Sequence, residues 1–351
     1  MKKILIINRK NTDNLGDQAI GNAMVNLFSS KDTKVDHAEF CYINRKHSLN
    51  PDKRIPSDDL IILNNEKGKN RTFLLLMKWK LQNRGLCDCL KNTAYDLVII
   101  GGGELLQSNS IFPCALNYWV RMIHKKQPKT RIILFGVGVT GNFTAKDYKE
   151  ISNALKYVHE VYVRDEQSKA NLNSIFKRIC KVIPDVVFSA NACNCSVSRR
   201  DVYVGITSGN RITKYGLMGN DEEQYFQKMM TLVEDIKTDD PNQDIKLLYT
   251  TNEDLHACRR FNNYIVSKGK KPLAIPCIHS VEDYMALMSK ALKVYSPRMH
   301  GCILCEIGGG MAVPVLISPK MKSYELRYAN NLDLASLYKQ LLIAANEVIN
   351  C

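Results

Sequence analysis

The residues best suited to chemistry lie in one short segment of the second half of the chain, Ser296 to Gly301. Arg298 and His300 stand two positions apart there, after an expected strand and at the start of an expected helix. A guanidinium can bind a carboxylate or phosphate through two parallel hydrogen bonds, and an imidazole can exchange protons near neutral pH. The pair could therefore hold an anionic substrate and act on it as acid or base. A purely structural histidine is the alternative interpretation of His300.

A second arginine in a comparable place is Arg164, which follows the apolar run Val161 to Val163. Its guanidinium could bind a carboxylate or phosphate in the same bidentate way. Asp165 and Glu166 come next and open an expected helix. An ion pair between Arg164 and one of these two carboxylates at the surface is the alternative.

Two glycine-containing turns follow strands in the first half of the chain. The turn from Asn14 to Asp17 contains Gly16 and leads into a helix, whose unpaired N–H groups could bind an anion; an ordinary N-cap is the alternative. The run Gly101-Gly102-Gly103-Glu104 ends a strand, which predicts either a tight turn or backbone contact with a ligand. No dinucleotide-binding motif is predicted, because the formal G-x-G-x-x-G match at Gly136 to Gly141 follows its strand.

Short apolar, β-branched runs alternate with helical patterns in both halves, which is typical of βαβ units and a fold of the α/β class. The expected strands are residues 3–8, 96–100, 131–139 and 161–164, then 202–207, 245–250, 293–295 and 313–318. Ligands of doubly wound parallel sheets bind where the strands end at their carboxyl side. The arginine-containing and glycine-containing segments are therefore expected in strand-end loops.

A chain of 351 residues exceeds what one hydrophobic core usually serves, so two domains are expected. A polar stretch without periodicity, residues 189–200, is interpreted as the linker. We predict two Rossmann-like domains, residues 1–190 and 201–332. A last helix, 333–351, would return to the first domain in a fold of the GT-B type. The polar, basic segment 44–71 is interpreted as an insertion loop.

The net charge of +14 favours an anionic partner, which could be a phosphorylated substrate, a nucleic acid or a membrane rich in acidic lipid. Nucleic acid is not expected, because the basic residues are dispersed and no recognition motif accompanies them. Lysines beside tryptophans predict peripheral contact with an anionic membrane, with ordinary solvated lysines as the alternative. The residues are Lys78, Trp79, Lys80, Trp119, Lys125 and Lys126.

The cellular setting is predicted from the first residues and from the cysteines. The apolar run at the start stops at Asn8-Arg9-Lys10, so it is interpreted as a first strand rather than a secretory signal. No apolar stretch approaches the ~18 residues of a membrane-spanning helix. Twelve scattered cysteines then predict reduced thiols in a cytoplasmic protein, and their spacing completes no zinc tetrad.

Taken together, five short motifs resemble the polysaccharide pyruvyltransferase family in order and spacing. They are Asn14-x-Gly16-Asp17, Gly101-Gly102-Gly103-Glu104, Val163-Arg164-Asp165-x-x-Ser168, Pro184-Asp185 and Ser296-x-Arg298-x-His300. The resemblance extends from residue 1 to about residue 335. Met299 replaces a commoner leucine, and the 44–71 segment has no counterpart in the family pattern.

The resemblance implies a GT-B-like fold with the active site in the interdomain cleft. It also implies transfer of pyruvate from phosphoenolpyruvate to two hydroxyls of one sugar, as a ketal, in capsule, exopolysaccharide or cell-wall glycan biosynthesis. Phosphoenolpyruvate would be the donor substrate, with no cofactor and no metal, and the acceptor a glycan or lipid-linked oligosaccharide. The alternative is a GT-B glycosyltransferase that uses a nucleotide sugar.

The same resemblance assigns roles to individual residues. Arg164 and Arg298 would bind the donor from facing domains, with His300 as general acid and Asp17 as a weaker candidate base. The other substrate-binding residues that it implies are Asn14, Gly16, Gly102, Gly103, Glu104, Ser296 and Lys320.

Overall fold

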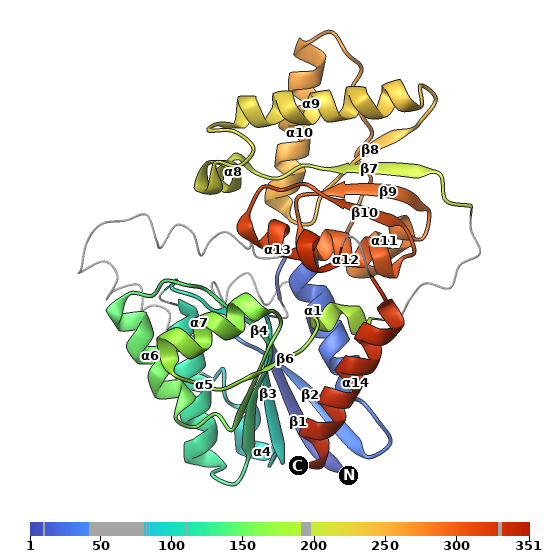
Figure 1. The fold of residues 1–351 in the computed structure, drawn as a ribbon. Helices are drawn as coiled ribbons and strands as arrows, with labels where there is room; N and C mark the ends of the chain where they lie inside the picture. Colours follow the sequence, from blue (N-terminus) through green and yellow to red (C-terminus); the bar gives the residue numbers. More distant parts are fainter. Residues whose placement is uncertain are drawn as a thin grey trace. The chain divides into compact units, whose positions relative to one another are not determined.

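The computed structural model describes residues 1–9, 11–41, 81, 83, 85–109, 111–190, 198–328 and 332–351. Within these residues the chain forms two compact units (Figure 1). Unit 1 comprises Met1–Thr12, Asp17–Ala190 and Ala335–Cys351, and unit 2 comprises Asp13–Gly16 and Asn191–Leu334. The predicted insertion at 44–71 and the residues Lys78, Trp79 and Lys80 lie outside the described part of the chain.

The described part of unit 1 contains a six-stranded parallel sheet in the order β2-β1-β3-β4-β5-β6. Its strands are β1 (Lys2–Asn8), β2 (Thr33–Glu39), β3 (Leu97–Leu106), β4 (Arg131–Val139), β5 (Glu160–Val163) and β6 (Lys181–Val182). Its helices are α1 (Leu15–Phe28), α4 (Cys89–Asn92), α5 (Ile111–Lys126), α6 (Ala145–Leu155), α7 (Glu166–Phe176), the short 3-10 helix η2 (Val186–Ser189) and α14 (Leu334–Asn350).

Both faces of this sheet are covered, which is why its central strands are continuously apolar. Figure 1 shows α5 and α6 on one face and α1 and α14 on the other. Successive side chains of β1 alternate between the faces, and Leu5 and Ile7 join the core beneath α5 and α6. The residues Ile4 to Ile7 are all at most 1% exposed.

Trp119 on α5 is part of this core and is fully buried. Its indole N–H donates a hydrogen bond of 2.8 Å to the carbonyl of Phe40, so both its apolar ring and its polar atom are satisfied inside the protein. The prediction that Trp119 helps to form a membrane-facing surface is therefore wrong. The sequence shows a tryptophan near lysines but not the direction in which the ring points.

Helix α14 belongs to unit 1, although it follows unit 2 in the chain. Leu341, Ala345 and Val348 are buried. A guanidinium N–H of Arg131 donates to the carbonyl of Val348 over 3.2 Å, and Lys181 pairs with Glu347 at 2.9 Å. These contacts join the end of the chain to the strands of the first sheet.

The described part of unit 2 contains a four-stranded parallel sheet in the order β10-β9-β7-β8. Its strands are β7 (Asp201–Gly205), β8 (Ile245–Leu248), β9 (Ala291–Ser296) and β10 (Met311–Pro314). Its helices are α8 (Gly209–Tyr215), α9 (Glu222–Asp239), α10 (Asn252–Ser267), α11 (Val281–Met288), α12 (Met299–Ile307) and α13 (Pro319–Tyr328).

Three further properties concern the described residues as a whole. All ten of their cysteines are free thiols. They contain no cluster of three or more His, Cys, Asp or Glu side chains with the geometry of a metal site. Among them, no helix combines the length and apolar character that crossing a bilayer requires.

Candidate active site

The turn between β9 and α12 in unit 2 presents Arg298 and His300. The hydroxyl oxygen of Ser296 accepts a hydrogen bond from the backbone N–H of Arg298 and donates one to its carbonyl, both at 3.1 Å. A side chain at Gly301 would bring its Cβ within 2.6 Å of that hydroxyl. Ser296 and Gly301 therefore fix the local backbone that carries the two reactive side chains.

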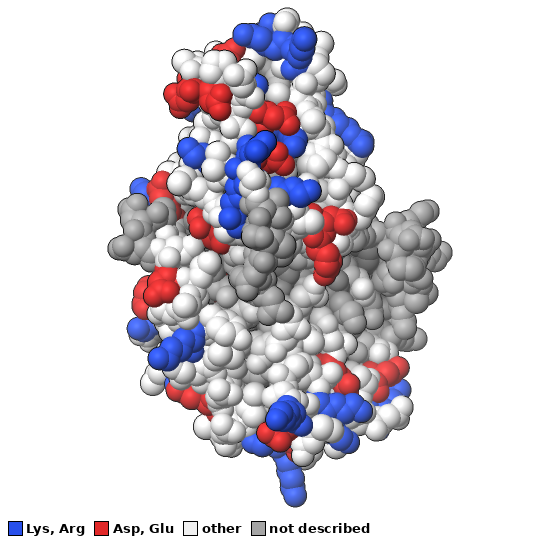
Figure 2. Space-filling model, turned by 90° about the vertical axis from the view of Figure 1, so that its right-hand side faces the viewer, with Lys and Arg blue, Asp and Glu red and all other residues white. Residues whose placement is uncertain are grey.

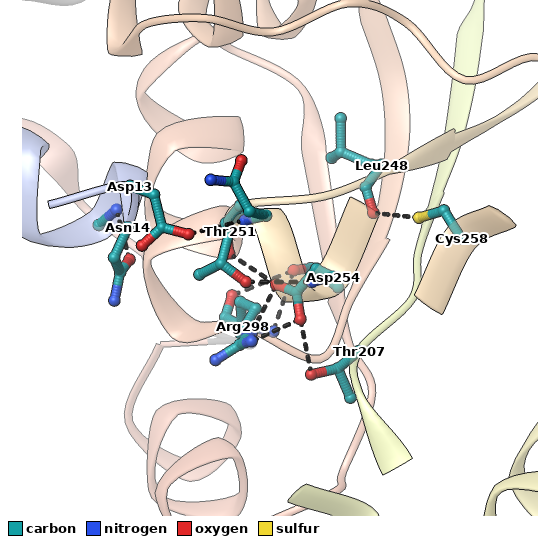
Figure 3. Close-up of polar contacts among 12 residues, drawn as sticks. Asp13, Asn14, Thr207, Leu248, Thr251, Asp254, Cys258 and Arg298 are labelled. Atoms are coloured by element: carbon teal, nitrogen blue, oxygen red, sulfur yellow. Dashed lines mark hydrogen bonds and ion pairs between the residues drawn. The ribbon is translucent and has the colours of Figure 1, made fainter. Parts of the chain in front are cut away.

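The guanidinium of Arg298 is held by the carboxylate of Asp254, the residue at the third position of α10 (Figure 3). Arg298 Nε donates to Asp254 Oδ2 at 3.0 Å, and an N–H of its terminal nitrogens donates to Oδ1. Asp254 is fully buried and also accepts hydrogen bonds from the hydroxyls of Thr207 and Thr250, at 3.0 and 3.2 Å. The strand-end loops after β7, β8 and β9 thus meet at one carboxylate.

Two opposing effects act on the pKa of Asp254. Burial alone would raise it, but the charge and hydrogen bonds of Arg298 outweigh burial and hold the pKa below its ordinary value. The positive charge of Arg211 on α8 acts in the same direction. Asp254 is therefore ionised at neutral pH and fixes the orientation of Arg298.

Residues 13–16 group with unit 2 and pack against the same loops. Asp13 accepts a hydrogen bond of 2.8 Å from the first N–H of α10, at Asn252, and the N–H of Leu15 donates to the carbonyl of Thr250 at 3.0 Å. Asn14 accepts from the N–H of Gly16 through its side-chain oxygen. Figure 3 shows Asp13 and Asn14 beside Thr251 and the Asp254–Arg298 pair.

Gly16 is necessary because the imidazole of His300 occupies the space that a side chain would need. A Cβ at this position would collide with the ring at Nδ1. Two motifs that lie at opposite ends of the sequence, one containing Asn14 and Gly16 and one containing Arg298 and His300, are therefore neighbours within unit 2. Ser296 belongs to the same group, and Lys320 lies in the first turn of α13.

Arg164 of unit 1 has a different environment, in which three carboxylates surround its guanidinium. Nitrogen–oxygen distances are 3.6 Å to Glu104, 3.4 Å to Asp165 and 3.8 Å to Asp185. The side chain of Arg164 is only 5% exposed. The ion pair between Arg164 and Asp165, which was the alternative interpretation of the sequence, is thus present. Arg164 is buried, however, and not a surface residue. Gly138 makes room for it, since a Cβ there would lie 2.8 Å from a guanidinium nitrogen.

The glycine run lies inside β3 and against helix α1, so the prediction that the run ends its strand is wrong, because β3 continues to Leu106. Gly102 and Gly103 have φ values of +74° and +72°, which side chains rarely adopt, and a Cβ at Gly102 would collide with Ile20. Asp17 lies close to this run, with Oδ1 4.0 Å from where a Cβ of Gly103 would be. Asp17 also pairs with Arg9 at 3.5 Å. The close approach of α1 accounts for Gly102, the positive φ accounts for Gly103, and at Gly101 a Cβ would collide with the carbonyl oxygen of Phe135 on β4.

The predicted site residues thus form two groups, one in each unit. Unit 2 brings together Asn14, Gly16, Ser296, Arg298 and His300, and unit 1 contains Asp17, Gly102, Gly103, Glu104 and Arg164. Sequence reasoning missed Arg9, Thr207, Arg211, Thr250 and Asp254. The pattern Thr251-x-x-Asp254 after a strand marks a helix start, but it does not reveal that the carboxylate turns inward to Arg298.

Comparisons with known proteins agree with this architecture. A comparison with curated protein sequences gives no match. The UDP-GlcNAc 2-epimerase of Neisseria meningitidis, solved with UDP-GlcNAc, has a TM-score of 0.51 at 13% identity, covering 100% of both chains. S. aureus MnaA, solved with UDP, has a TM-score of 0.53 at 12% identity, covering 100% of this chain and 88% of that one. The predicted GT-B-like α/β fold is confirmed.

The family comparison is more specific than these similarities of fold. The family model described as polysaccharide pyruvyl transferase matches residues 14–315, a range that contains both groups of site residues, whereas Lys320 lies outside it. The match confirms the resemblance that the five motifs indicated. The chain belongs to the polysaccharide pyruvyl transferase family.

Proposed function

We propose that this protein transfers pyruvate from phosphoenolpyruvate to two hydroxyls of one sugar, forming a cyclic ketal in capsule, exopolysaccharide or cell-wall glycan biosynthesis. The family match supports pyruvyl transfer onto a glycan. The observation that carries the choice of donor is the Arg298 guanidinium, oriented by buried Asp254, two residues before His300. An anion-binding group and a proton-transfer group then lie on the same turn.

The donor would bind at the start of α12. Phosphoenolpyruvate carries a carboxylate and a phosphate, and the positive end of the helix dipole at Met299 favours an anion. Because Asp254 orients Arg298 before the donor arrives, little side-chain freedom is lost on binding. Arg164 is the proposed second ligand of the donor, and simultaneous contact of both arginines with one molecule is a prediction of this proposal.

In the proposed reaction, protonated His300 gives its proton to the methylene carbon of phosphoenolpyruvate, and positive charge develops at C2. The first sugar hydroxyl adds to C2 and loses its proton to a base, for which Asp17 is the candidate. The second hydroxyl then attacks C2 and passes its proton to the now neutral His300, while phosphate leaves with the electron pair of its C–O bond. The products are the ketal and inorganic phosphate. Phosphoenolpyruvate is a substrate here, and the scheme uses no separate cofactor or metal.

The remaining assignments of substrate and place are part of the same proposal. Asn14, Gly16, Gly102, Gly103, Glu104, Ser296 and Lys320 are proposed to line the substrate sites. The acceptor is proposed to be a glycan or lipid-linked oligosaccharide, reached in the cytoplasm. Peripheral contact with an anionic membrane would rest on lysines such as Lys125 and Lys126 of α5, without Trp119.

Calorimetric titration of phosphoenolpyruvate and of UDP into the protein tests the proposal. Saturable binding of phosphoenolpyruvate, and phosphate release that depends on added p-nitrophenyl glycosides with free hydroxyls, are expected. Mass spectrometry of the glycoside should then detect the ketal. Binding of UDP without binding of phosphoenolpyruvate would instead favour a glycosyltransferase that uses a nucleotide sugar.

A further inference from the structure

A pocket of about 610 Å³ lies in unit 1, away from the strand ends that carry Arg164 and Glu104. Its walls include the first residues of three strands, Lys2 of β1, Leu97 of β3 and Arg131 of β4. The sheet is parallel, so these amino ends lie at the edge opposite to the predicted catalytic loops. The volume falls within the range of roughly 300 to 1,000 Å³ that small-molecule pockets occupy.

Basic side chains outnumber acidic ones around this pocket. Lys2, Lys126, Lys129 and Arg131 line it, against the single acidic side chain of Asp96. Arg131 is neutralised by an ion pair of 2.6 Å with Glu160. The ammonium group of Lys2 donates to the carbonyl of Ile349. The pocket therefore keeps an excess of positive charge after its internal pairs are formed.

The two remaining lysines are the groups available to a ligand. Within the described part of the chain, the ammonium groups of Lys126 and Lys129 make no hydrogen bond or ion pair. Lys126 ends α5, and Lys129 stands two residues before Arg131 at the start of β4. Figure 2 shows Lys and Arg side chains, among some acidic ones, at the end of unit 1 where Figure 1 places the chain termini.

The rest of the lining indicates what kind of ligand fits. Pro128, Leu97 and Ile349 provide apolar surface beside the lysines. An ammonium is a compact point charge that binds phosphate without needing a planar, bidentate partner. We infer that this pocket binds the phosphate group of a small ligand with an apolar body, at a site separate from the transferase reaction. A soluble phosphate ester and a lipid headgroup both have this chemistry.

Calorimetry with three probes separates these sources. The probes are sn-glycerol 3-phosphate, dioctanoyl phosphatidic acid and 1,2-dioctanoylglycerol, which provide the phosphate alone, the phosphate on an apolar body, and the apolar body alone. Saturable binding of glycerol 3-phosphate would identify a soluble ester as sufficient. Binding of the phosphatidic acid alone would identify a lipid headgroup. Failure of both phosphate probes to saturate, or equal binding of dioctanoylglycerol, overturns the inference.

The double variant Lys126→Ala/Lys129→Ala shows whether the binding occurs in the pocket. It should weaken binding of the phosphate probe at least tenfold, because both unpaired charges are lost. The matched control is Lys125→Ala/Lys146→Ala, which removes two exposed lysines of unit 1 that do not line the pocket, and it should change binding less than twofold. Equal losses in the two variants would mean general surface attraction and would contradict the inference.

Phosphate release from phosphoenolpyruvate provides an independent readout. The Lys126→Ala/Lys129→Ala variant should keep its normal turnover, since neither lysine is placed among the donor-binding residues. A protein without turnover that still binds the phosphate probe in this pocket would contradict the proposed function and leave this inference standing. A large fall in turnover in the double variant, with unchanged probe binding, would contradict the inference that this pocket is a phosphate site separate from the reaction.

Discussion

Arg164 and Arg298 each follow a strand of a parallel sheet, yet their charges are balanced in different ways. Arg298 forms a bidentate pair with one fully buried carboxylate, Asp254, near which Arg211 adds a second positive charge. Arg164 is surrounded by three carboxylates within 4 Å. Two arginines that look equivalent in sequence therefore differ in the electrostatic potential that an incoming anion meets at each guanidinium. We expect the donor to gain more binding energy from Arg298 than from Arg164.

The largest expected effect lies on the Arg298 side of this comparison. His300→Ala should fold normally and lose about 10² to 10⁴ in turnover, because loss of a positioned general acid has an effect of this size. The measurement is phosphate release from phosphoenolpyruvate alongside thermal melting. His256→Ala, which replaces an exposed histidine of α10, is the matched control. Near-normal turnover in His300→Ala would remove His300 from the mechanism.

Removing the buried carboxylate of each site should have unequal effects on stability. Asp254→Ala leaves Arg298 largely buried without its bidentate partner. We therefore expect the free energy of unfolding to fall by about 3 to 5 kcal/mol. Asp185→Ala leaves two carboxylates near Arg164 and removes the hydrogen bond that Asp185 accepts from the N–H of Val187. We therefore expect the free energy of unfolding to fall by about 1 to 2 kcal/mol. Urea unfolding of both variants measures the difference. Equal losses in the free energy of unfolding would show that Arg164 and Arg298 depend on their buried carboxylates to the same extent.

Acid should weaken the contribution of Asp254 to folding stability in a defined pH range. The pKa of Asp254 is lower in the folded protein than in the unfolded chain, so its stabilisation is fully present above the ordinary aspartate value of about 3.9. It is lost as the pH falls through the lower, folded value. Urea midpoints of the wild type and Asp254→Asn should therefore converge below about pH 4. A gap between them that stays constant from neutral pH to about pH 3 would contradict this cause.

The smallest expected effect concerns the carboxylates around Arg164. Glu104→Gln removes one negative charge near that guanidinium, and if Arg164 contacts the donor, phosphoenolpyruvate should bind about threefold more tightly. Calorimetric titration measures the change. Glu166→Gln, an exposed carboxylate that pairs with Lys169, is the control and should have no effect. Unchanged affinity in Glu104→Gln would argue against donor binding at Arg164.

The sequence predicted the α/β fold and eight of the described strands, because apolar, β-branched runs are visible residue by residue. It missed β2 and β6, which are polar or very short, and it gave no order of the strands within the sheets. It also selected Arg298, His300 and Gly16, which stand in short motifs at strand ends. It could not predict that Gly16 faces His300, since that contact depends on tertiary packing between distant segments. Asp254 was missed for the same reason, because as a helix-start residue it looks like any capping carboxylate until its partner is known. The direction of Trp119 likewise depended on the packing of α5 against the sheet.

The central claim is that the donor binds at Arg298, and calorimetric titration of phosphoenolpyruvate into an Arg298 variant tests it most directly. Arg298→Met combined with Asp254→Leu removes the guanidinium together with its buried partner, which avoids leaving an unpaired charge in the core. With thermal melting showing a folded protein, affinity for phosphoenolpyruvate should fall by about 2 to 4 kcal/mol, roughly 30- to 1,000-fold. A folded double variant that binds phosphoenolpyruvate within about twofold of the wild type would contradict the account.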